Sequence, residues 1–224
     1  HDLKIKGNDL VVGTHGRSFW ILDDLALVRQ LDGPREDEAV LFEPAPTYRI
    51  APPMDIARPT AKGKNYHVTL GVRGVFYDKT VTDGTSRRIF LDSGTNPPDG
   101  IVIDYWLKEG HSDDCIKLSL TDPVGTLINS YTTNSKDENA NSNDPSRQTQ
   151  TITAVAGMNR FVWDMHYPDG PLVPGDKLAE KGIKGPLVTP GRYKVHLSIG
   201  ENTYSKDIEL QPDPRIDNSQ EDYD

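Results

Sequence analysis

The chain has 224 residues, of which 35% are hydrophobic, and it contains 17 Pro and 19 Gly. This composition suits one full domain plus an appendage, with many turns rather than long helices. The formal net charge of -9 argues against binding to nucleic acid or to an anionic membrane surface, because both need clustered Lys and Arg. No apolar run approaches the roughly 20 residues that span a bilayer, and the single cysteine, Cys115, allows neither an intrachain disulfide nor a Cys-based zinc site.

The N-terminal segment predicts a small set of β-strands. Runs of β-branched or aromatic residues at 2–6, 10–14 and 17–22 are separated by Gly and Asn, as is typical of strands joined by tight turns. Two or three strands cannot bury both of their faces, and a lone hairpin is marginal in water. The chain also lacks an initiator Met, so we expect it to begin inside a larger protein, with first strands that need a partner outside this chain.

Residues 23–64 lead away from these strands. Asp23 and Asp24 precede the run 25–31, which predicts a short helix with an acidic N-terminus. Residues 32–64 are rich in Pro, which lacks a backbone donor and resists helical angles, so we expect an irregular connector. The runs 40–42 and 48–50 are its expected anchors on a surface.

Residues 65–216 predict an all-β domain, an immunoglobulin- or fibronectin-like β-sandwich without the antibody-type disulfide. Strand-like runs lie at 88–91, 101–107, 116–120, 127–131, 159–164, 191–199 and 203–210, while the run 66–71 is left open. Turn signals occur at 96–100, 122–125 and 200–202, and the first of them ends in Gly100, which is free to adopt a positive φ. Trp106 and Trp163 are the expected large core residues.

Two segments are expected to be mobile and solvated, because both are poor in apolar side chains. They are the polar loop 132–150 and the acidic tail 217–224. Within the loop, oxygen-bearing side chains alternate as they would in a calcium site, at Asp137, Asn139, Asn141 and Asn143. Ser142 and Gln148 stand where such a site needs Gly and Glu. A solvated loop without a cofactor is therefore favoured, with calcium as the alternative.

Several segments resemble one protein family. The stretch Asp9-Leu-Val-Val-Gly-Thr-His-Gly-Arg-Ser-Phe-Trp-Ile-Leu-Asp-Asp24 resembles the last blade of the sortilin-like, BNR-repeat β-propeller proteins that are often labelled glycosyl hydrolases in bacteria. The segments 96–107, 156–168 and 190–195 are similar to the β-sandwich that follows the propeller there. The propeller-closing motif comprises Gly13, His15, Gly16, Arg17, Trp20, Asp23 and Asp24.

The resemblance implies an organisation and a setting. Residues 1–31 would be terminal propeller strands, residues 32–64 the connector and residues 65–216 the sandwich. The main partner would be the remainder of the propeller, as upstream polypeptide or as a separate chain, with other proteins or glycans as further partners. The parent protein would be exported, to the extracellular space or the periplasm.

Two groups of residues are candidates for catalysis. His15, Arg17, Asp23 and Asp24 hold the carboxylates that a glycosidase needs, but adjacent residues on a strand point to opposite faces, so the two Asp residues are poorly placed as a pair. The structural alternative is a turn permitted by Gly13 and Gly16, and a helix capped by Asp23 or Asp24. The second group, Asp164, His166 and Asp169, lacks a nucleophile and favours a hydrogen-bonded loop.

Aromatic side chains are candidates for stacking against sugars, namely Tyr105, Trp106, Tyr131 and Tyr167. Strand alternation allows only one of Tyr105 and Trp106 to face the core. The leading hypothesis is a non-catalytic blade-closing segment plus β-sandwich, with structural, assembly or protein-interaction roles. The alternatives are part of a glycoside hydrolase whose active site lies in blades outside this chain, and a carbohydrate-binding module.

Overall fold

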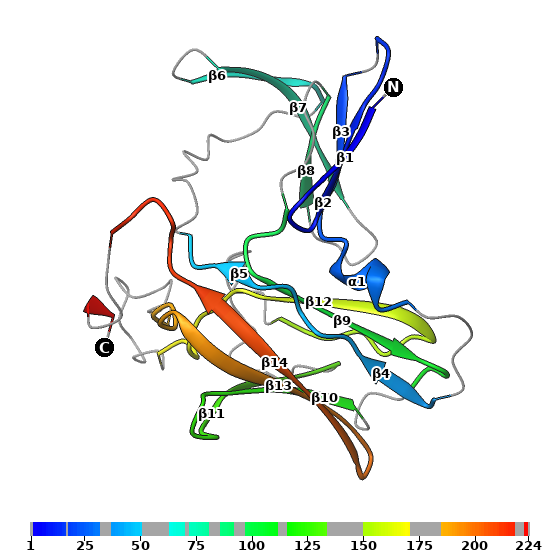
Figure 1. The fold of residues 1–224 in the computed structure, drawn as a ribbon, viewed down its shortest axis with the longest axis vertical. Coiled ribbons are helices and arrows are strands. Elements are labelled where there is room, and N and C mark those ends of the chain that lie inside the picture. The colour runs from blue at the N-terminus through cyan, green and yellow to red at the C-terminus, as the bar shows by residue number, and fades with distance from the viewer. Residues whose placement is uncertain are drawn as a thin grey trace. The chain divides into compact units, whose positions relative to one another are not determined.

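The computed structural model describes residues 2–16, 18–31, 37–50, 63–69, 72–80, 86–91, 97–111, 116–133, 150–170, 185–217 and 222–223. These residues are mostly β-strand, with one short α-helix among them, so the chain belongs to the all-β class (Figure 1). The chain divides into two compact units, residues 1–50 together with 98–224, and residues 51–97.

The first unit begins with a three-stranded antiparallel sheet. Its strands are β1 (Asp2–Lys6), β2 (Asp9–Gly13) and β3 (Phe19–Leu22), in the order β1-β2-β3, and we call it the N-terminal sheet. The strands and the tight turn at Gly7 are confirmed, and Gly7 has a φ of +62°. The short helix predicted after them is confirmed as α1 (Ala26–Arg29).

The rest of this unit contains two sheets. One has the order β11-β10-β13-β14-β5, formed by β11 (Leu127–Thr132), β10 (Ile116–Thr121), β13 (Gly191–Ile199), β14 (Asn202–Gln211) and β5 (Thr47–Tyr48). The other has the order β12-β9-β4, formed by β12 (Gly157–Trp163), β9 (Ile101–Leu107) and β4 (Ala39–Leu41). Each strand of 65–216 outside residues 51–97 matches a run predicted from sequence, and the turns at 122–125 and 200–202 join β10 to β11 and β13 to β14.

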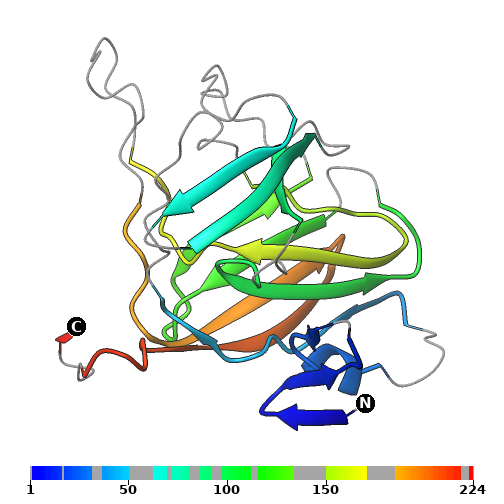
Figure 2. The ribbon, with the colours of Figure 1, turned by 90° about the horizontal axis from the view of Figure 1, so that it is seen from above.

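Both sheets contribute side chains to one hydrophobic core, which we call the two-sheet core. Alternate residues of β9 point into it, at Ile101, Ile103, Tyr105 and Leu107, as do alternate residues of β10, β12, β13 and β14. Figure 2 shows β9 and β12 as one layer and β13 and β14 as another. Burial of such side chains contributes about 1.5–3 kcal/mol each, which makes this core the main source of stability.

The aromatic content of the core differs from the prediction at one position. Trp163 is fully buried, as expected, but the prediction of Trp106 as a core residue is wrong. Trp106 lies opposite Met158 and Val40 on the outer face of its sheet. Its neighbour Tyr105 takes the core position because it shares the alternation of Ile101, Ile103 and Leu107, so the prediction that only one of the pair faces inward is confirmed.

The connector is more regular than predicted. Ala39–Leu41 form β4 and pair with β9, and Thr47–Tyr48 form β5 and pair in parallel with β14. Leu41 and Phe42 are buried, as expected of an anchor. At the second predicted anchor, Tyr48 and Ile50 are exposed, and Arg49 makes the contacts instead: its backbone N–H donates to Gln211 and its Nε donates to the Val188 carbonyl at 2.8 Å.

The second unit, residues 51–97, contains a sheet of its own. The strands β6 (Asn65–Thr69), β7 (Val72–Thr80) and β8 (Ser86–Phe90) pair antiparallel in the order β6-β7-β8. Phe76 is buried, and its ring lies 5.6 Å from that of Phe90. Residues 65–216, predicted as one domain, therefore cover parts of both compact units. Cys115, Arg17 and the segment 134–149, with the calcium alternative, lie outside the described residues.

Candidate functional site

One face of the N-terminal sheet consists entirely of apolar side chains. Residues that pair directly across antiparallel strands share a face. The register pairs Leu3 with Val12 and Val12 with Trp20, and it pairs Ile5 with Leu10 and Leu10 with Leu22. These six side chains form two rows of three, which we call the apolar face.

The opposite face of the same sheet is mixed. It carries Lys4 and Lys6 on β1, Val11 on β2, and Phe19 and Ile21 on β3. The Phe19 ring lies across Gly13, since a Cβ on Gly13 would be 3.5 Å from the ring. The absence of a side chain at Gly13 thus makes room for Phe19.

No side chain of β1, β2 or β3 is buried. On the apolar face, Leu3 is 66% exposed, Ile5 57%, Trp20 64% and Leu22 51%; on the mixed face, Phe19 is 79% and Ile21 60% exposed. Scattered exposed apolar residues are normal, whereas a contiguous apolar patch marks an interaction surface. The N-terminal sheet has no core of its own, so the apolar face is the candidate functional site of this chain.

The N-terminal sheet is tied to α1. Asp24 N–H donates to the Asp9 carboxylate at 3.1 Å, Leu25 N–H donates to the Asn8 carbonyl at 2.6 Å, and Arg29 donates to the Asn8 side chain at 2.7 Å. The turn between β1 and β2 is therefore held against the start of the helix.

Gln30 then joins this element to the chain after β4. Its side-chain carbonyl accepts from Glu43 N–H at 2.9 Å, and its amide donates to the Glu43 carbonyl at 3.0 Å. The Gln30 side chain thus pairs with the Glu43 backbone as a neighbouring strand would. This contact attaches the sheet and α1 to the two-sheet core.

An ion pair lies on the outer face of β9 and β12. Arg160 donates from Nε and Nη2 to the two oxygens of Asp104, at 2.7 and 2.9 Å. The Asp104 side chain is only 8% exposed, whereas that of Arg160 is 56% exposed. The hydrogen bond with Asp104 raises the pKa of Arg160, and the Asp24 carboxylate adds to this shift. Asp24, next to α1, therefore lies within electrostatic reach of this face.

The first predicted catalytic group is not brought together. His15 and Gly16 lie exposed in the loop before β3, while Asp23 and Asp24 follow its end. The four residues of β3, at about 3.3 Å each, separate the loop with His15 from Asp23 and Asp24 by roughly 13 Å. Asp24, with a φ of 56°, accepts from Ala26 N–H at 2.8 Å, but it precedes the N-cap residue, Leu25, and no side-chain cap hydrogen bond forms there, so neither Asp23 nor Asp24 is the N-cap of α1. The turn is supplied by Gly16, with a φ of +76°, and not by Gly13, which lies within β2.

The second group forms a hydrogen-bonded loop. His166 Nδ1 lies 2.7 Å from the Asp164 carbonyl, and Asp169 accepts from Gly185 N–H at 2.9 Å. Met165 between them has a φ of 61° and pairs with Val188 through its carbonyl. These contacts hold the loop against residues 185–188 and match the structural interpretation.

The four candidate aromatics do not share a surface. Tyr105 is fully buried and donates to the Thr153 carbonyl; burial raises its pKa. Tyr131 is also buried, against the Phe161 ring at 4.6 Å, and burial followed by the Asp164 charge raises its pKa. Trp106 is half-buried, and Tyr167 is 39% exposed. Only the last two keep ring surface that a sugar could contact.

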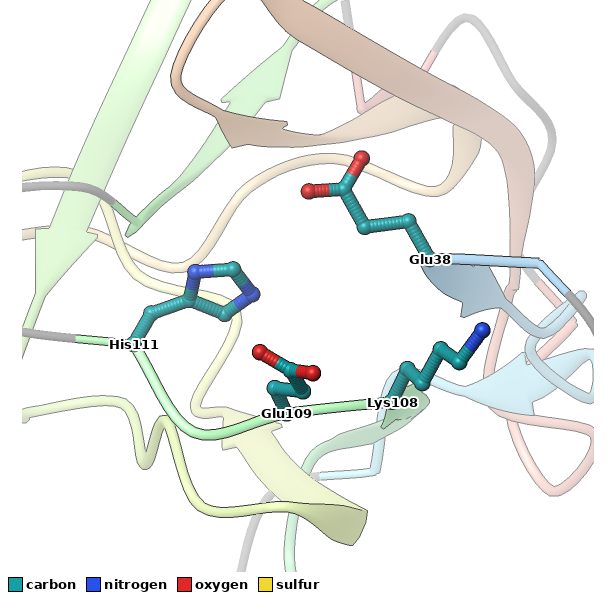
Figure 3. A pocket seen from close by; sticks show the side chains of 4 residues that line it. All are labelled: Glu38, Lys108, Glu109 and His111. Carbon is teal, nitrogen blue, oxygen red and sulfur yellow. The ribbon is translucent and has the colours of Figure 1, made fainter.

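A polar pocket of about 290 Å³ lies at the end of β9, lined by Glu38, Lys108, Glu109 and His111. Figure 3 shows the Glu109 carboxylate and the His111 ring turned toward the same opening, with the Glu38 carboxylate across from them. Glu38 accepts from the Asn202 side chain at 3.3 Å. Among the residues that the structure describes, no three His, Cys, Asp or Glu side chains are grouped so that they could hold a metal ion.

Sequence patterns do not identify the apolar face as such. Trp20 belongs to the propeller-closing motif, whereas Leu3, Ile5, Leu10, Val12 and Leu22 are recognisable from sequence only as strand formers. The signal was present as alternation in 2–6 and in 10–12, but strand register decides whether the apolar positions of neighbouring strands share a face.

Comparisons with family models, with curated proteins and with solved structures found no match to this chain. In the described part of the chain, no helix combines the length and the apolar character needed to cross a membrane.

Proposed function

We propose that this chain is a non-catalytic structural and assembly module. In this proposal the two-sheet core is an immunoglobulin- or fibronectin-like β-sandwich, and the N-terminal sheet completes a blade of a sortilin-like, BNR-repeat β-propeller supplied by the rest of an exported protein. The observation that carries the proposal is the apolar face: six apolar side chains in register, four of them more than half exposed. Such a surface is stable in water when another β-structure covers it.

The attachment of this sheet supports the same role. Three hydrogen bonds fasten the turn between β1 and β2 to α1, and the Gln30 side chain fastens α1 to Glu43. These bonds give the N-terminal sheet a defined connection to the two-sheet core. A segment without a structural role would not need such a connection. The carboxylates of Asp24 and Asp169 accept hydrogen bonds from the backbone N–H groups of Ala26 and Gly185, which favours a structural role for them over hydrolysis.

The test mixes this chain with a separately produced polypeptide that precedes it in the parent protein. Binding measured by calorimetry is expected, and Ile5→Lys on the apolar face should weaken it by at least about tenfold, because an unpaired charge would be buried. The matched control is Lys117→Ala, an exposed residue of β10 on the five-stranded sheet, which should bind as the unchanged chain does. Two folded pieces that fail to associate would refute the proposal.

A further inference from the structure

The composition of the apolar face suits contact with the same face of a second copy of this chain. The six strand residues of this face include no charged side chain, and the indole N–H of Trp20 is their one polar side-chain group, so two such faces can meet without desolvating a charge or opposing like charges. Residues 1–24 contain four Asp and three Lys or Arg, a net charge of -1, while the whole chain carries -9. The charge that would drive two copies apart therefore lies mostly outside this sheet.

The arrangement of side chains also favours stacking over edge pairing. Two sheets stack face to face about 10 Å apart, with side chains interdigitating between them. Stacking covers both rows of the apolar face and leaves Lys4 and Lys6 of the mixed face in water. Pairing of two copies edge to edge along β3 would leave the apolar face uncovered.

We propose that, when this chain stands alone, a second copy docks on the apolar face and forms a two-fold dimer of stacked N-terminal sheets. A two-fold axis parallel to the strands places β3 of one copy over β1 of the other, so that the large Trp20 side chain meets the smaller Leu3. This inference uses the same face as the proposed function but does not rest on it, because its occupant is a second copy of this chain.

Two adjacent residues of β3 supply a matched pair of variants. Leu22 belongs to the apolar face and is 51% exposed, whereas Ile21 belongs to the mixed face and is 60% exposed. Leu22→Lys places a charge in the dimer interface, and Ile21→Lys places the same charge in the same strand on the other side. Leu3→Lys on β1 repeats the first change from a different strand.

The experiment is sedimentation velocity on the full chain alone, from about 1 to 100 μM. The unchanged chain should shift from one to two copies with concentration; Leu22→Lys and Leu3→Lys should raise the dissociation constant at least about tenfold, and Ile21→Lys should leave it within about twofold. Circular dichroism confirms that each variant keeps its β-structure.

Three outcomes would overturn the inference. These are a chain that stays monomeric throughout, equal effects of Leu22→Lys and Ile21→Lys, and masses that grow beyond two copies as edge-paired strands would give. The result is independent of the proposed function, because the upstream polypeptide is absent. A dimer without an upstream complex refutes the function alone, and an upstream complex without a dimer refutes this inference alone.

Discussion

Gly100, just before β9, occupies a position where the structure tolerates no side chain. It precedes β9 with a φ of +147°, and a Cβ at this position would lie 2.4 Å from the Trp163 carbonyl oxygen and 2.9 Å from Val162 Cγ1. Both the backbone angle and the closeness of β12 exclude a side chain here. The positive φ predicted from the turn signal at Gly100 is confirmed.

Gly100→Ala is expected to lower the free energy of unfolding by about 2–5 kcal/mol, the sum of left-handed strain and overpacking. The control is Gly125→Ala, where φ is +93° but nothing lies within 4 Å, so only the strain of about 1–2 kcal/mol applies. Urea unfolding measures both variants. Equal losses would show that the contact with β12 does not limit this position.

The ion pair between Asp213 and Arg215 makes the free energy of unfolding depend on pH in the acidic range. Arg215 Nε donates to Asp213 Oδ1 at 2.9 Å and its Nη2 donates to Oδ2 at 2.6 Å, which lowers the pKa of Asp213 from 3.8 to about 2. Because the folded pKa lies below the unfolded one, the unfolded state binds more protons in this interval, and stability rises with pH there.

Arg215→Gln is therefore expected to cost stability above about pH 4 and to cost progressively less as the pH falls toward 2. Thermal unfolding at a series of pH values from 2 to 6 measures this slope. Arg192→Gln, at an exposed position of β13, serves as the control and should leave the slope unchanged. A loss for Arg215→Gln that is independent of pH would contradict the assignment.

At the scale of the element, α1 is stabilised mainly by hydrogen bonds from side chains, because its own backbone hydrogen bonds are too few. A four-residue helix is too short to be stable alone. The Gln30 side chain bonds both backbone groups of Glu43, and its amide also donates to the Ala26 carbonyl at 3.2 Å. This one side chain joins the N-terminal sheet and α1 to the segment after β4.

Gln30→Ala should speed hydrogen exchange at the Glu43 amide by roughly 5- to 30-fold, because two net hydrogen bonds of about 0.5–1 kcal/mol each are lost. Unfolding of the two-sheet core should change little, since Gln30 is not one of its residues. Gln211→Ala removes a side chain that donates to the exposed Glu209, and it should leave the Glu43 amide unchanged. Unaltered exchange in Gln30→Ala would mean that another contact holds the element.

At the scale of the whole molecule, the two compact units differ in where their buried residues lie. The two-sheet core draws its described residues from 39–41 and from 101–210, and none of them from 51–97. The second unit has a separate buried residue, Phe76, paired with Phe90. The stability of the two-sheet core should therefore not depend on the second unit.

Replacing residues 51–97 with a Gly/Ser linker of about 20 residues, which reaches roughly 25 Å on average, tests this independence. The main unfolding transition should keep its midpoint within a few degrees and should keep its enthalpy, because residues 51–97 do not unfold as part of it. Calorimetry provides the measurement. A collapse of the main transition would show that residues 51–97 are part of one cooperative core.

Local patterning alone was enough to predict much of this fold. The apolar run 101–107 and the run 191–199, which alternates strictly from Tyr193 to Ile199, correspond to β9 and β13 without any shift of bounds, and the Gly-containing turns lie where predicted. Alternation works here because each of these strands has one face in the core, so the pattern within the strand carries the information. β7 was missed because Gly74 and the charged Arg73, Asp78 and Lys79 interrupt its apolar run.

Only the tertiary structure decided which strands and faces meet. β4 and β5 are too short to be recognised locally and exist because Leu41 pairs with Tyr105 and Thr47 with Leu210. The choice of Tyr105 over Trp106 for the core, and the alignment of Leu3, Val12 and Trp20 on one face, follow from register. The sequence by itself determined that this protein is built of strands. The register of β1, β2 and β3 decided which of their side chains share a face, because a shift by one residue would turn every side chain to the other side.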